Sequence, residues 1–282
     1  MPPIILDGKA LAASIRADLH ELVTKKNLHP CLAIVTVGDD PASAVYVRNK
    51  KKACDEIGIA CRHVCLPTDS TTKQVINTVK GLNYDVNVHG IIVQLPLPAH
   101  IDADRVTKEV WRSKDVDGFG QDSLFHPCTP EGVVRLMKHY NIIMESQHAI
   151  VFGRSDIVGK PLAKMLLNEN ATVTVCHSRT PSHVKTHLLG NASIIIAATG
   201  VPNLIKLSDI PNYEHRDFTC IDVGINRDEN GKLCGDIPQE IKDVSYAYTP
   251  VPGGIGPMTV AMLMEHVVQA ALWQQEATND SM

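Results

Sequence analysis

The sequence lacks several features that would assign the protein to particular classes. Its 282 residues carry a net charge of −4, so it has no basic excess of the kind that binds nucleic acid or anionic membranes. No apolar run appears long enough to span a bilayer, and the N-terminus has neither the basic start nor the apolar core of a signal peptide. We therefore expect a cytoplasmic protein with no nucleic-acid or membrane partner.

The eight cysteines include no C-x-x-C pair. They are scattered through apolar segments, which is typical of small, buried and reduced side chains. The nearest approach to a metal-binding cluster is Cys61-Arg-His63-Val-Cys65, but its alternation is that of a single strand and no second ligand pair accompanies it. The cysteines therefore indicate no metal site.

Apolar strands and amphipathic helices alternate along the chain, as in a parallel sheet covered on both faces. In the first half this pattern predicts helices at 6–28, 41–57 and 71–82 and strands at 31–37, 59–66 and 89–98. Asp40 and Thr71 are the expected N-caps of two of these helices. In the second half we predict a helix capped by Thr129, strands at 148–152, 172–176, 193–198 and 218–223, and a last helix at 258–273.

A polar segment with glycine and proline, residues 113–130, interrupts the alternation and indicates a domain junction. We predict an α/β domain over residues 1–120, completed by the C-terminal helix at about 260–282, and a second domain over 121–259. The strands of the second domain begin roughly 20–25 residues apart, as in a doubly wound, Rossmann-like sheet.

The segment 150–167 has the pattern of a strand, a glycine turn and a helix. A helix that follows a strand this closely directs its free amides and positive dipole end toward a ligand such as a phosphate. The turn lacks the full G-x-G-x-x-G dinucleotide pattern, because Ser155 replaces the second glycine and Gly159 comes one residue late. By itself the turn is equally compatible with an ordinary strand-to-helix connection.

The residues after the second strand of this domain include no acidic side chain. In dinucleotide folds an acid at this point binds the 2′-hydroxyl of NAD, whereas hydroxyl or basic groups suit the 2′-phosphate of NADP. Ser178 and Arg179 occupy this place, and Arg154 in the glycine turn adds another positive charge. A bound dinucleotide is therefore expected to be NADP; the alternative is that both arginines are ordinary solvated residues.

Tyr46 and Lys50 are four residues apart and share one face of a predicted helix. A partly buried lysine beside a tyrosine is suited to acid–base catalysis. The run Lys50-Lys51-Lys52 is more typical of a solvated helix face, so this pair alone favours the structural interpretation over the catalytic one.

Three further segments place polar or rigid groups where α/β proteins bind ligands. Gln94 ends an apolar strand, the position at which open sheets bind their ligands. Asp115 and Asp117 suit a metal, a cationic ligand or a ligand rich in N–H groups, although a surface turn explains them almost as well. Residues 250–259 contain three glycines and three prolines, and such a rigid backbone before a helix favours a functional role.

Taken together, these motifs resemble the bifunctional methylenetetrahydrofolate dehydrogenase/cyclohydrolase family, and they span nearly the whole chain in that family's order. The matching segments are Tyr46-Val-x-x-Lys50, Val93-Gln-Leu-Pro-Leu-Pro98, Lys114-Asp-Val-Asp-Gly118, Pro127-Cys-Thr-Pro-x-Gly132, Gly153-Arg-Ser-x-Ile-Val-Gly-x-Pro161, Asp222-Val-Gly-Ile-Asn226 and Pro250-Val-Pro-Gly-Gly-Ile-Gly-Pro-Met-Thr259. The last motif is long and specific.

The resemblance implies a homodimer whose chain forms an N-terminal α/β domain and a C-terminal Rossmann-like domain, with a folate cleft between them. It implies NADP-dependent oxidation of 5,10-methylenetetrahydrofolate and hydrolysis of the methenyl product to 10-formyltetrahydrofolate, a part of one-carbon metabolism. By position, Lys50 is the implied acid–base residue, Tyr46 and Gln94 shape its environment, and Asp117 binds the pterin. The other implied folate contacts are Val93, Leu95, Pro252, Gly253, Gly254, Ile255 and Gly256; the dinucleotide contacts are Gly153, Arg154, Ser155, Ser178 and Ile225.

The chain departs from the family between Gly118 and Pro127, where members carry a longer insert, and this changes one wall of the implied folate site. Three other functions stay open. A shikimate-type NADP dehydrogenase has a similar architecture but no use for the 250–259 motif. A dehydrogenase that has lost the hydrolase step, or a non-catalytic NADP sensor, has no need of an aligned tyrosine, lysine and glutamine.

Overall fold

The computed structural model describes residues 2–215 and 217–279, which belong to two compact units. The first unit comprises Met1–Ala12 and Thr129–Thr259, and the second comprises Ala13–Cys128 and Val260–Met282. The unit boundaries fall inside two helices, α1 (Gly8–Lys25) and α9 (Ile255–Asn279), so each of these helices contributes residues to both units.

These bounds differ from the predicted domains at two places. Residues 1–12 group with the second half of the chain because β1 (Ile4–Ile5) pairs in parallel with β11 (Ala247–Tyr248), and a strand of two residues has no periodicity for the sequence to reveal. The junction lies at Cys128 rather than at residue 120, since the Cys128 thiol donates to the carbonyl of Val116 and holds this segment in the second unit.

The first unit is built on a six-stranded parallel sheet of order β1-β11-β8-β7-β5-β6. From β5 (His148–Phe152) the chain passes to β6 (Thr172–Cys176) on one side and then returns to β7 (Ile194–Ala197) on the other. The next strand, β8 (Thr219–Asp222), continues outward. This reversal beside β5 is the switch point at which doubly wound sheets bind ligands, and the predicted Rossmann-like domain is confirmed.

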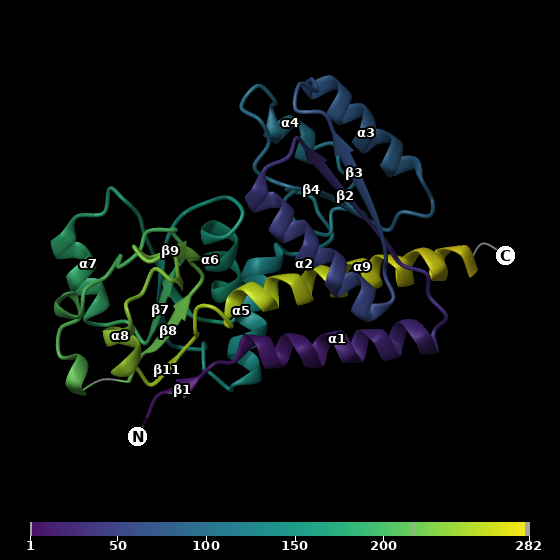
Figure 1. Cartoon of the computed structure of the whole chain (residues 1–282). Helices are drawn as coiled ribbons and strands as arrows, with labels where there is room; N and C mark the ends of the chain where they lie inside the picture. Colours follow the sequence, from purple (N-terminus) through teal and green to yellow (C-terminus); the bar gives the residue numbers. More distant parts are fainter. Residues whose placement is uncertain (1, 216, 280–282) are drawn as a thin grey trace. The chain divides into compact units, whose positions relative to one another are not determined.

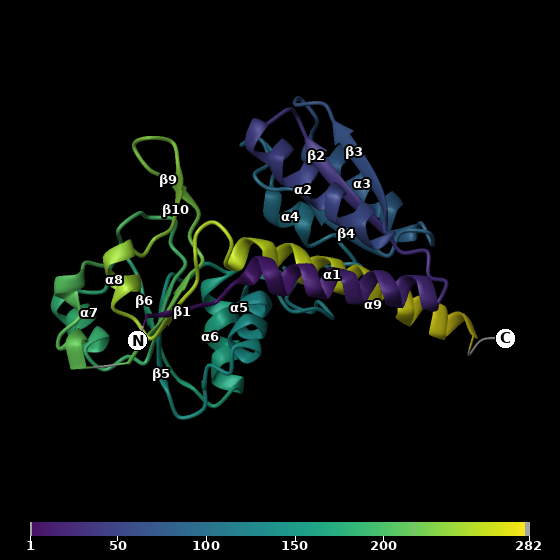
Figure 2. The same ribbon diagram turned by 60° about the horizontal axis from the view of Figure 1, so that its bottom comes forward.

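Helices cover both faces of this sheet. Figures 1 and 2 show α5 (Cys128–His139) and α6 (Gly159–Asn168) on one face, with α7 (Ser182–Leu189) and α8 (Gln239–Asp243) on the other. Strands buried on both sides must be apolar throughout, as in β7, all four residues of which are buried. Figure 2 also shows the hairpin of β9 (Asn226–Arg227) and β10 (Leu233–Cys234) standing away from the sheet. Two 3₁₀ turns, Leu207–Asp209 and Tyr213–His215, complete the unit.

The prediction that Thr129 caps α5 is wrong. The helix begins one residue earlier, at Cys128, so Thr129 lies inside its first turn. The Thr129 hydroxyl lies 3.1 Å from the hydroxyl of Thr259, and this contact with a distant part of the chain is invisible in the local sequence.

The second unit contains a three-stranded parallel sheet of order β3-β2-β4, formed by Ala60–Leu66, Cys31–Val37 and Gly90–Val93. Its helices are α2 (Pro41–Ile57), α3 (Thr72–Tyr84), α4 (Ala103–Thr107) and parts of α1 and α9 (Figure 1). The predicted caps are confirmed: an Asp40 carboxylate oxygen accepts from the Ser43 amide at 2.7 Å, and Thr71 forms a capping box with Gln74.

Both faces of this smaller sheet are buried. Ala33 and Val35 of β2 pack with the apolar faces of α3 and α4, whereas the alternate residues Leu32 and Ile34 point to the opposite face and are also fully buried. On α9, the Met264 sulfur accepts from the Cys54 thiol of α2 at 3.6 Å. The helix that carries the predicted site residues Tyr46 and Lys50 is therefore attached to α9 at Cys54.

Helix α9 is longer and more apolar than the sequence analysis recognised. Its stretch Ile255–Ala277 has the length and mean hydropathy (1.3) of a membrane span, so the prediction that no such run exists is wrong. In the most apolar part of this helix, 61% of the residues are buried, and core helices of globular proteins are similarly long and apolar. Its apolar residues are therefore explained by packing within the fold.

A buried ion pair lies at the carboxyl end of β8. The Asp222 carboxylate accepts from the Lys242 ammonium at 2.7 Å and from the amides of Asp236 and Ile237 at 2.8 and 3.1 Å. The side chains of Asp222 and Lys242 are 0% and 5% exposed. Burial raises the pKa of Asp222, and the lysine charge and the two amide donors oppose this shift.

We predict that Lys242→Met lowers the free energy of unfolding by about 3–5 kcal/mol, because it leaves a buried carboxylate without its counter-charge. Denaturant unfolding measures this loss. Lys160→Met is the matched control: Lys160 pairs with Asp156 at 2.6 Å, but these side chains are 62% and 85% exposed, so the unfolding midpoint should barely move. Equal losses of stability in the two variants would contradict the stabilising role of the buried Asp222–Lys242 ion pair.

Candidate active site

The glycine turn after β5 brings backbone close to backbone. Gly153 has φ of 120°, and a Cβ at this position would lie 2.5 Å from the carbonyl oxygen of Ala198. A Cβ on Gly159, the first residue of α6, would lie 2.3 Å from the carbonyl oxygen of Gly153. Gly159 therefore serves the close strand–helix packing that the last glycine of dinucleotide turns provides, despite its shifted position.

The amides of this turn are arranged for an anion. The Ser155 hydroxyl accepts from the amides of Val158 and Gly159 at 3.2 and 3.3 Å and so caps the start of α6. The preceding amides of Arg154 and Ser155 meet no acceptor within the described part of the chain. They are therefore available to phosphate oxygens, together with the exposed Arg154 side chain.

At the end of β6 a compact turn presents hydroxyl and basic groups. Thr180 closes this turn, since its hydroxyl accepts from the His177 amide at 3.0 Å and its amide donates to the His177 carbonyl at 2.9 Å. Ser178 and Arg179 are both exposed there. The turn carries no carboxylate, so its chemistry suits a 2′-phosphate better than a free 2′-hydroxyl.

The rigid segment before α9 rests on the start of α1. The Lys9 amide donates to the Gly253 carbonyl at 2.8 Å, and a Cβ on Gly8 would meet the carbonyl oxygen of Gly254. Gly256 lies beside Ile225, whose Cδ1 atom is 3.6 Å from the position of a Gly256 Cβ. Within the first unit, the structure thus brings a predicted folate contact next to a predicted dinucleotide contact.

In the second unit the predicted lysine and glutamine meet. The Lys50 ammonium donates to Gln94 Oε1 at 3.1 Å, and Gln94 Nε2 donates to the Leu95 carbonyl at 2.8 Å. Gln94 is thereby oriented at the carboxyl end of β4 with its oxygen toward Lys50. Tyr46 lies one turn earlier on α2 and is 49% exposed, which leaves its ring accessible to a ligand.

Asp117 belongs to the same group. Burial raises the pKa of Asp117; the nearby Lys50 charge opposes this shift, the Asp115 carboxylate adds to it, and His266 opposes it. The loop that carries Asp117 is held firmly, since the Gly120 amide donates to Asp115 at 2.7 Å. The Asp117 carboxylate therefore lies within electrostatic range of Lys50, which is hydrogen-bonded to Gln94 at the edge of the smaller sheet.

Two predicted contacts are placed less favourably for side-chain recognition. Val93 is 5% exposed and packs in the core of the second unit, and Ile255 is 3% exposed. Pro252, Gly253 and Ile255 belong to the first unit, whereas Lys50 and Asp117 belong to the second. Val93 and Ile255 would therefore offer a ligand mainly backbone atoms.

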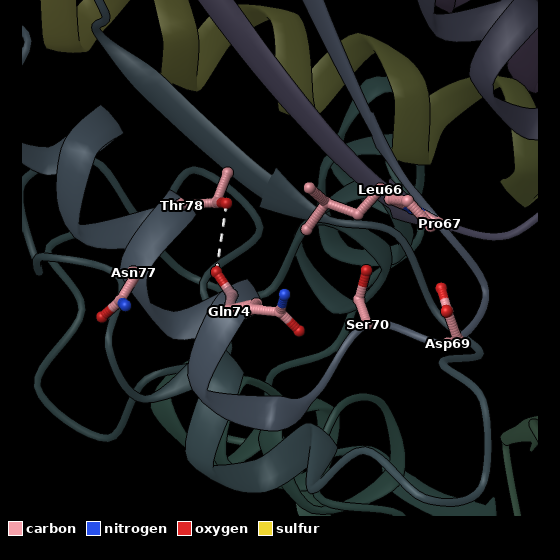
Figure 3. A pocket seen from close by; sticks show the side chains of 7 residues that line it. All are labelled: Leu66, Pro67, Asp69, Ser70, Gln74, Asn77 and Thr78. Atoms are coloured by element: carbon pink, nitrogen blue, oxygen red, sulfur yellow. Dashed lines mark hydrogen bonds between the residues drawn. The ribbon is translucent and has the colours of Figure 1, made fainter.

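Among residues 2–215 and 217–279, no group of three or more His, Cys, Asp or Glu side chains is arranged to hold a metal ion. A separate hollow of about 530 Å³ lies at the end of β3 and the start of α3, as Figure 3 shows. It contains none of the predicted site residues, and its only charged lining group is a carboxylate, which does not suit phosphates. It is lined by Leu66, Pro67, Asp69, Ser70, Gln74, Asn77 and Thr78.

Sequence reasoning missed a set of buried polar residues in the first unit. The sequence analysis included Asp222 in the motif Asp222-Val-Gly-Ile-Asn226 but assigned it no role, and it did not identify Asp236 or Lys242. The Asp236 carboxylate accepts from the Thr199 and Gly200 amides at 2.7 and 3.0 Å. The available signal was the Gly235-Asp236 step in an otherwise polar connection, which is too common to interpret alone.

The fold and the site define a two-domain α/β protein with a doubly wound dinucleotide-binding domain and a smaller domain that carries a lysine–glutamine–aspartate site. Two family models cover most of the chain: the catalytic domain of tetrahydrofolate dehydrogenase/cyclohydrolase matches residues 6–117, and the NAD(P)-binding domain of the same family matches residues 127–275. The chain belongs to the tetrahydrofolate dehydrogenase/cyclohydrolase family.

Individual relatives agree with the family models. A bifunctional protein FolD from Magnetococcus marinus is 46% identical over 95% of this chain and 96% of its own length. The crystal structure of the bifunctional FolD enzyme methylenetetrahydrofolate dehydrogenase/cyclohydrolase from Campylobacter jejuni superposes with a TM-score of 0.90 at 43% identity, covering 95% of this chain and 98% of that one. The Trypanosoma brucei enzyme, solved with NADP and an inhibitor, gives a TM-score of 0.89 at 31% identity over 97% and 98%.

These similarities confirm the predicted family and the two-domain α/β fold. They do not favour the shikimate-type or sensor alternatives, because the family models span both domains and the relatives match over nearly their full lengths. The roles of individual site residues stay predictions.

Proposed function

We propose that the protein oxidises 5,10-methylenetetrahydrofolate with NADP and hydrolyses the resulting methenyl compound to 10-formyltetrahydrofolate. The observation that carries this proposal is the Lys50–Gln94 hydrogen bond of 3.1 Å, formed beside Asp117 at the carboxyl edge of β4, in a chain of this family. A single folate molecule bound at this group would undergo both steps in succession.

The oxidation requires positioning rather than a strong base. NADP, when bound, supplies the nicotinamide ring that accepts a hydride from the methylene carbon. The chain's task is to hold the ring and the folate close together, which contributes much of the rate in such reactions. We assign the dinucleotide to the first unit, at Gly153, Arg154, Ser155, Ser178 and Ile225, because free amides and basic groups meet there.

The hydrolysis requires proton transfer. Loss of hydride leaves a cationic amidinium carbon, to which water adds before a carbon–nitrogen bond opens. In its uncharged form, the Lys50 amine can accept the proton of the attacking water. Gln94 fixes the position of the Lys50 nitrogen by accepting its hydrogen bond. Lys50 then returns the proton to the nitrogen that leaves, and the added hydroxyl releases its own proton to solvent as it becomes the formyl carbonyl.

Asp117 supplies the substrate contact in this scheme. An ionised carboxylate accepts hydrogen bonds from the N–H groups at the edge of the pterin, and such charge-assisted bonds are strong in a partly buried site. Tyr46, exposed one turn before Lys50, provides an aromatic ring against which the folate can pack. The folate-binding domain proposed here is the second unit, which carries Tyr46, Lys50, Gln94 and Asp117.

We further propose that the protein is a cytoplasmic homodimer. The eight cysteines form no disulfide, as expected for a reducing compartment. In the second unit β3 pairs with β2 along one edge, and its other edge meets no strand among the described residues. Such an edge is suited to pairing with a second copy, and light scattering on the purified protein tests this assignment.

Lys50→Met is expected to reduce the hydrolysis step by about 10²–10⁴-fold, the usual contribution of a positioned acid–base group. The assay mixes protein, methylenetetrahydrofolate and NADP and follows reduced cofactor and methenyl product in the ultraviolet. The wild type should accumulate reduced cofactor with little methenyl product, whereas the variant should accumulate both. Lys52→Met is the matched control from the same lysine run, since Lys52 is 79% exposed.

Full hydrolase activity in Lys50→Met would refute the role of this lysine. If methenyl product accumulates with the wild type, the shortened segment after Gly118 has cost the hydrolysis step. No reaction at all would favour a non-catalytic NADP-binding protein.

Folate affinity should depend on pH through Asp117. Only the ionised carboxylate accepts the pterin N–H bonds, so affinity falls as pH falls through the Asp117 pKa, which burial raises above the ordinary 3.8. Asp117→Asn should weaken folate binding at neutral pH, lower both activities and remove this acidic limb. Calorimetric titration with a folate analogue across pH measures the effect, and unchanged affinity in the variant would exclude the role.

A further inference from the structure

Two buried carboxylates, Asp222 and Asp236, lie at the carboxyl edge of the six-stranded sheet. Asp222 is the last residue of β8 and is 1% exposed, whereas Asp236 follows β10 and has no exposed surface. Removing a carboxylate from water is costly unless hydrogen bonds or charges compensate it. The donors around each carboxylate therefore indicate which parts of the chain the fold holds in place.

Asp222 holds the segment that carries Asp236. Its two oxygens accept from the amides of Asp236 and Ile237, at 2.8 and 3.1 Å. The Lys242 ammonium, 2.7 Å away, neutralises the Asp222 charge. The backbone at Asp236 is thereby fixed relative to β8.

Asp236 in turn holds the loops that follow two neighbouring strands. One oxygen accepts three bonds from the loop after β7: from the Thr199 amide at 2.7 Å, the Thr199 hydroxyl at 2.9 Å and the Gly200 amide at 3.0 Å. The other oxygen accepts from the Asn226 side-chain amide, after β8, at 2.8 Å. One side chain thus connects both loops.

Two glycines make room for the pair of carboxylates. A Cβ on Gly224 would lie 1.9 Å from Asp236 Oδ1, and a Cβ on Gly235 would lie 1.9 Å from Asp222 Oδ2. Each carboxylate therefore occupies the space in which the other segment lacks a side chain. This reciprocal fit leaves no space at either glycine for a larger residue, and it determines the path of the chain at Gly224.

The loops held by Asp236 border the glycine turn. Gly153 approaches the carbonyl of Ala198, the residue directly before Thr199. Ile225 lies between Gly224 and Asn226, and its side chain is 46% exposed although its neighbours are fixed. On one side of Ile225, Gly224 packs against the Asp236 carboxylate, and on the other side the Asn226 side chain bonds to it, at the edge where doubly wound sheets bind dinucleotides.

We propose that Asp236 is a positioning residue of the dinucleotide site: through Thr199, Gly200 and Asn226 it sets the two loops against which the nicotinamide half of NADP binds. This inference rests on the proposed function for the identity of the ligand. It assigns Asp236 an action through the loops and no contact with the reacting atoms.

The test compares Asp236→Asn with Asp243→Asn. The asparagine keeps the size of the side chain but removes its negative charge, so the bonds from Thr199 and Gly200 lose their charge assistance, and the contact with Asn226 can persist only if the Asn226 amide turns over. Asp243 is a matched control in the same unit: it is exposed, and its carboxylate accepts from the nearby Gln239 side chain at 2.8 Å. Isothermal titration calorimetry of the full-length protein with NADPH measures the affinity for the dinucleotide independently of any folate reaction.

We expect Asp236→Asn to weaken NADPH binding and raise the KM for NADP by about tenfold or more, as for the loss of charge-assisted hydrogen bonds. At saturating NADP, kcat should change much less, and hydrolysis of methenyltetrahydrofolate, which uses no NADP, should stay within about threefold of the wild type. Asp243→Asn should match the wild type in all of these measurements.

Unchanged NADPH affinity in Asp236→Asn would overturn the inference. An equal loss of both activities, in proportion to the folded fraction measured by circular dichroism, would also overturn it, because Asp236 would then be needed for folding alone. Failure of the proposed function is distinguishable: the wild type would show no folate turnover, while the NADPH titration would still report on Asp236.

Discussion

At the carboxyl edge of the six-stranded sheet, four glycines let other backbone atoms and two carboxylates come into direct contact with the main chain. The arrangement of the loops in the first unit depends on these close contacts. Gly153 lies against the carbonyl of Ala198, and Gly159 lies against Gly153. Gly224 and Gly235 give their space to two carboxylates. Because these contacts leave no room for a Cβ, the strand ends, the start of α6 and the loops beside it form one rigid rim at which amides remain available to a ligand.

The rim also explains why several charged side chains are buried in an otherwise apolar domain. Loops that must hold a fixed shape cannot rely on sheet hydrogen bonds, because they lie beyond the strand ends. Asp222 and Asp236 replace those bonds with charge-assisted ones to amides of three different segments. Lys242 compensates the first of these charges, and hydrogen-bond donors compensate the second.

The second unit solves a different problem, namely the placement of a mobile side chain. Lysine has a long, flexible stem, and the role proposed for Lys50 requires its nitrogen to have a defined position. Helix α2 carries the backbone of Lys50. Gln94, at the end of β4, fixes the Lys50 ammonium, which donates to Gln94 Oε1 at 3.1 Å. Gln94 is itself oriented by its bond to the Leu95 carbonyl. The site is therefore assembled from a helix face and a strand end that lie far apart in the sequence.

The sequence predicted many of the strands and helix ends, because these depend on residues that are close together in the chain. Apolar periodicity predicted β2, β5 and β6 to the residue, and Asp40 and Thr71 were recognised as helix caps, because strands buried on both faces and helix ends obey rules that span only a few residues. The family was identified for the same reason, since its motifs are contiguous stretches.

Tertiary structure alone decided what depends on distant partners. The pairing of β1 with β11 assigned residues 1–12 to the first unit, and the contact of Thr129 with Thr259 replaced the expected cap. The joint action of Asp222 and Asp236 was likewise hidden, because an aspartate next to a glycine has the same local pattern in any turn. Local sequence determined the strands, the caps and the motifs of this protein; the buried polar contacts at the sheet edge exist only where the folded chain brings their donors together.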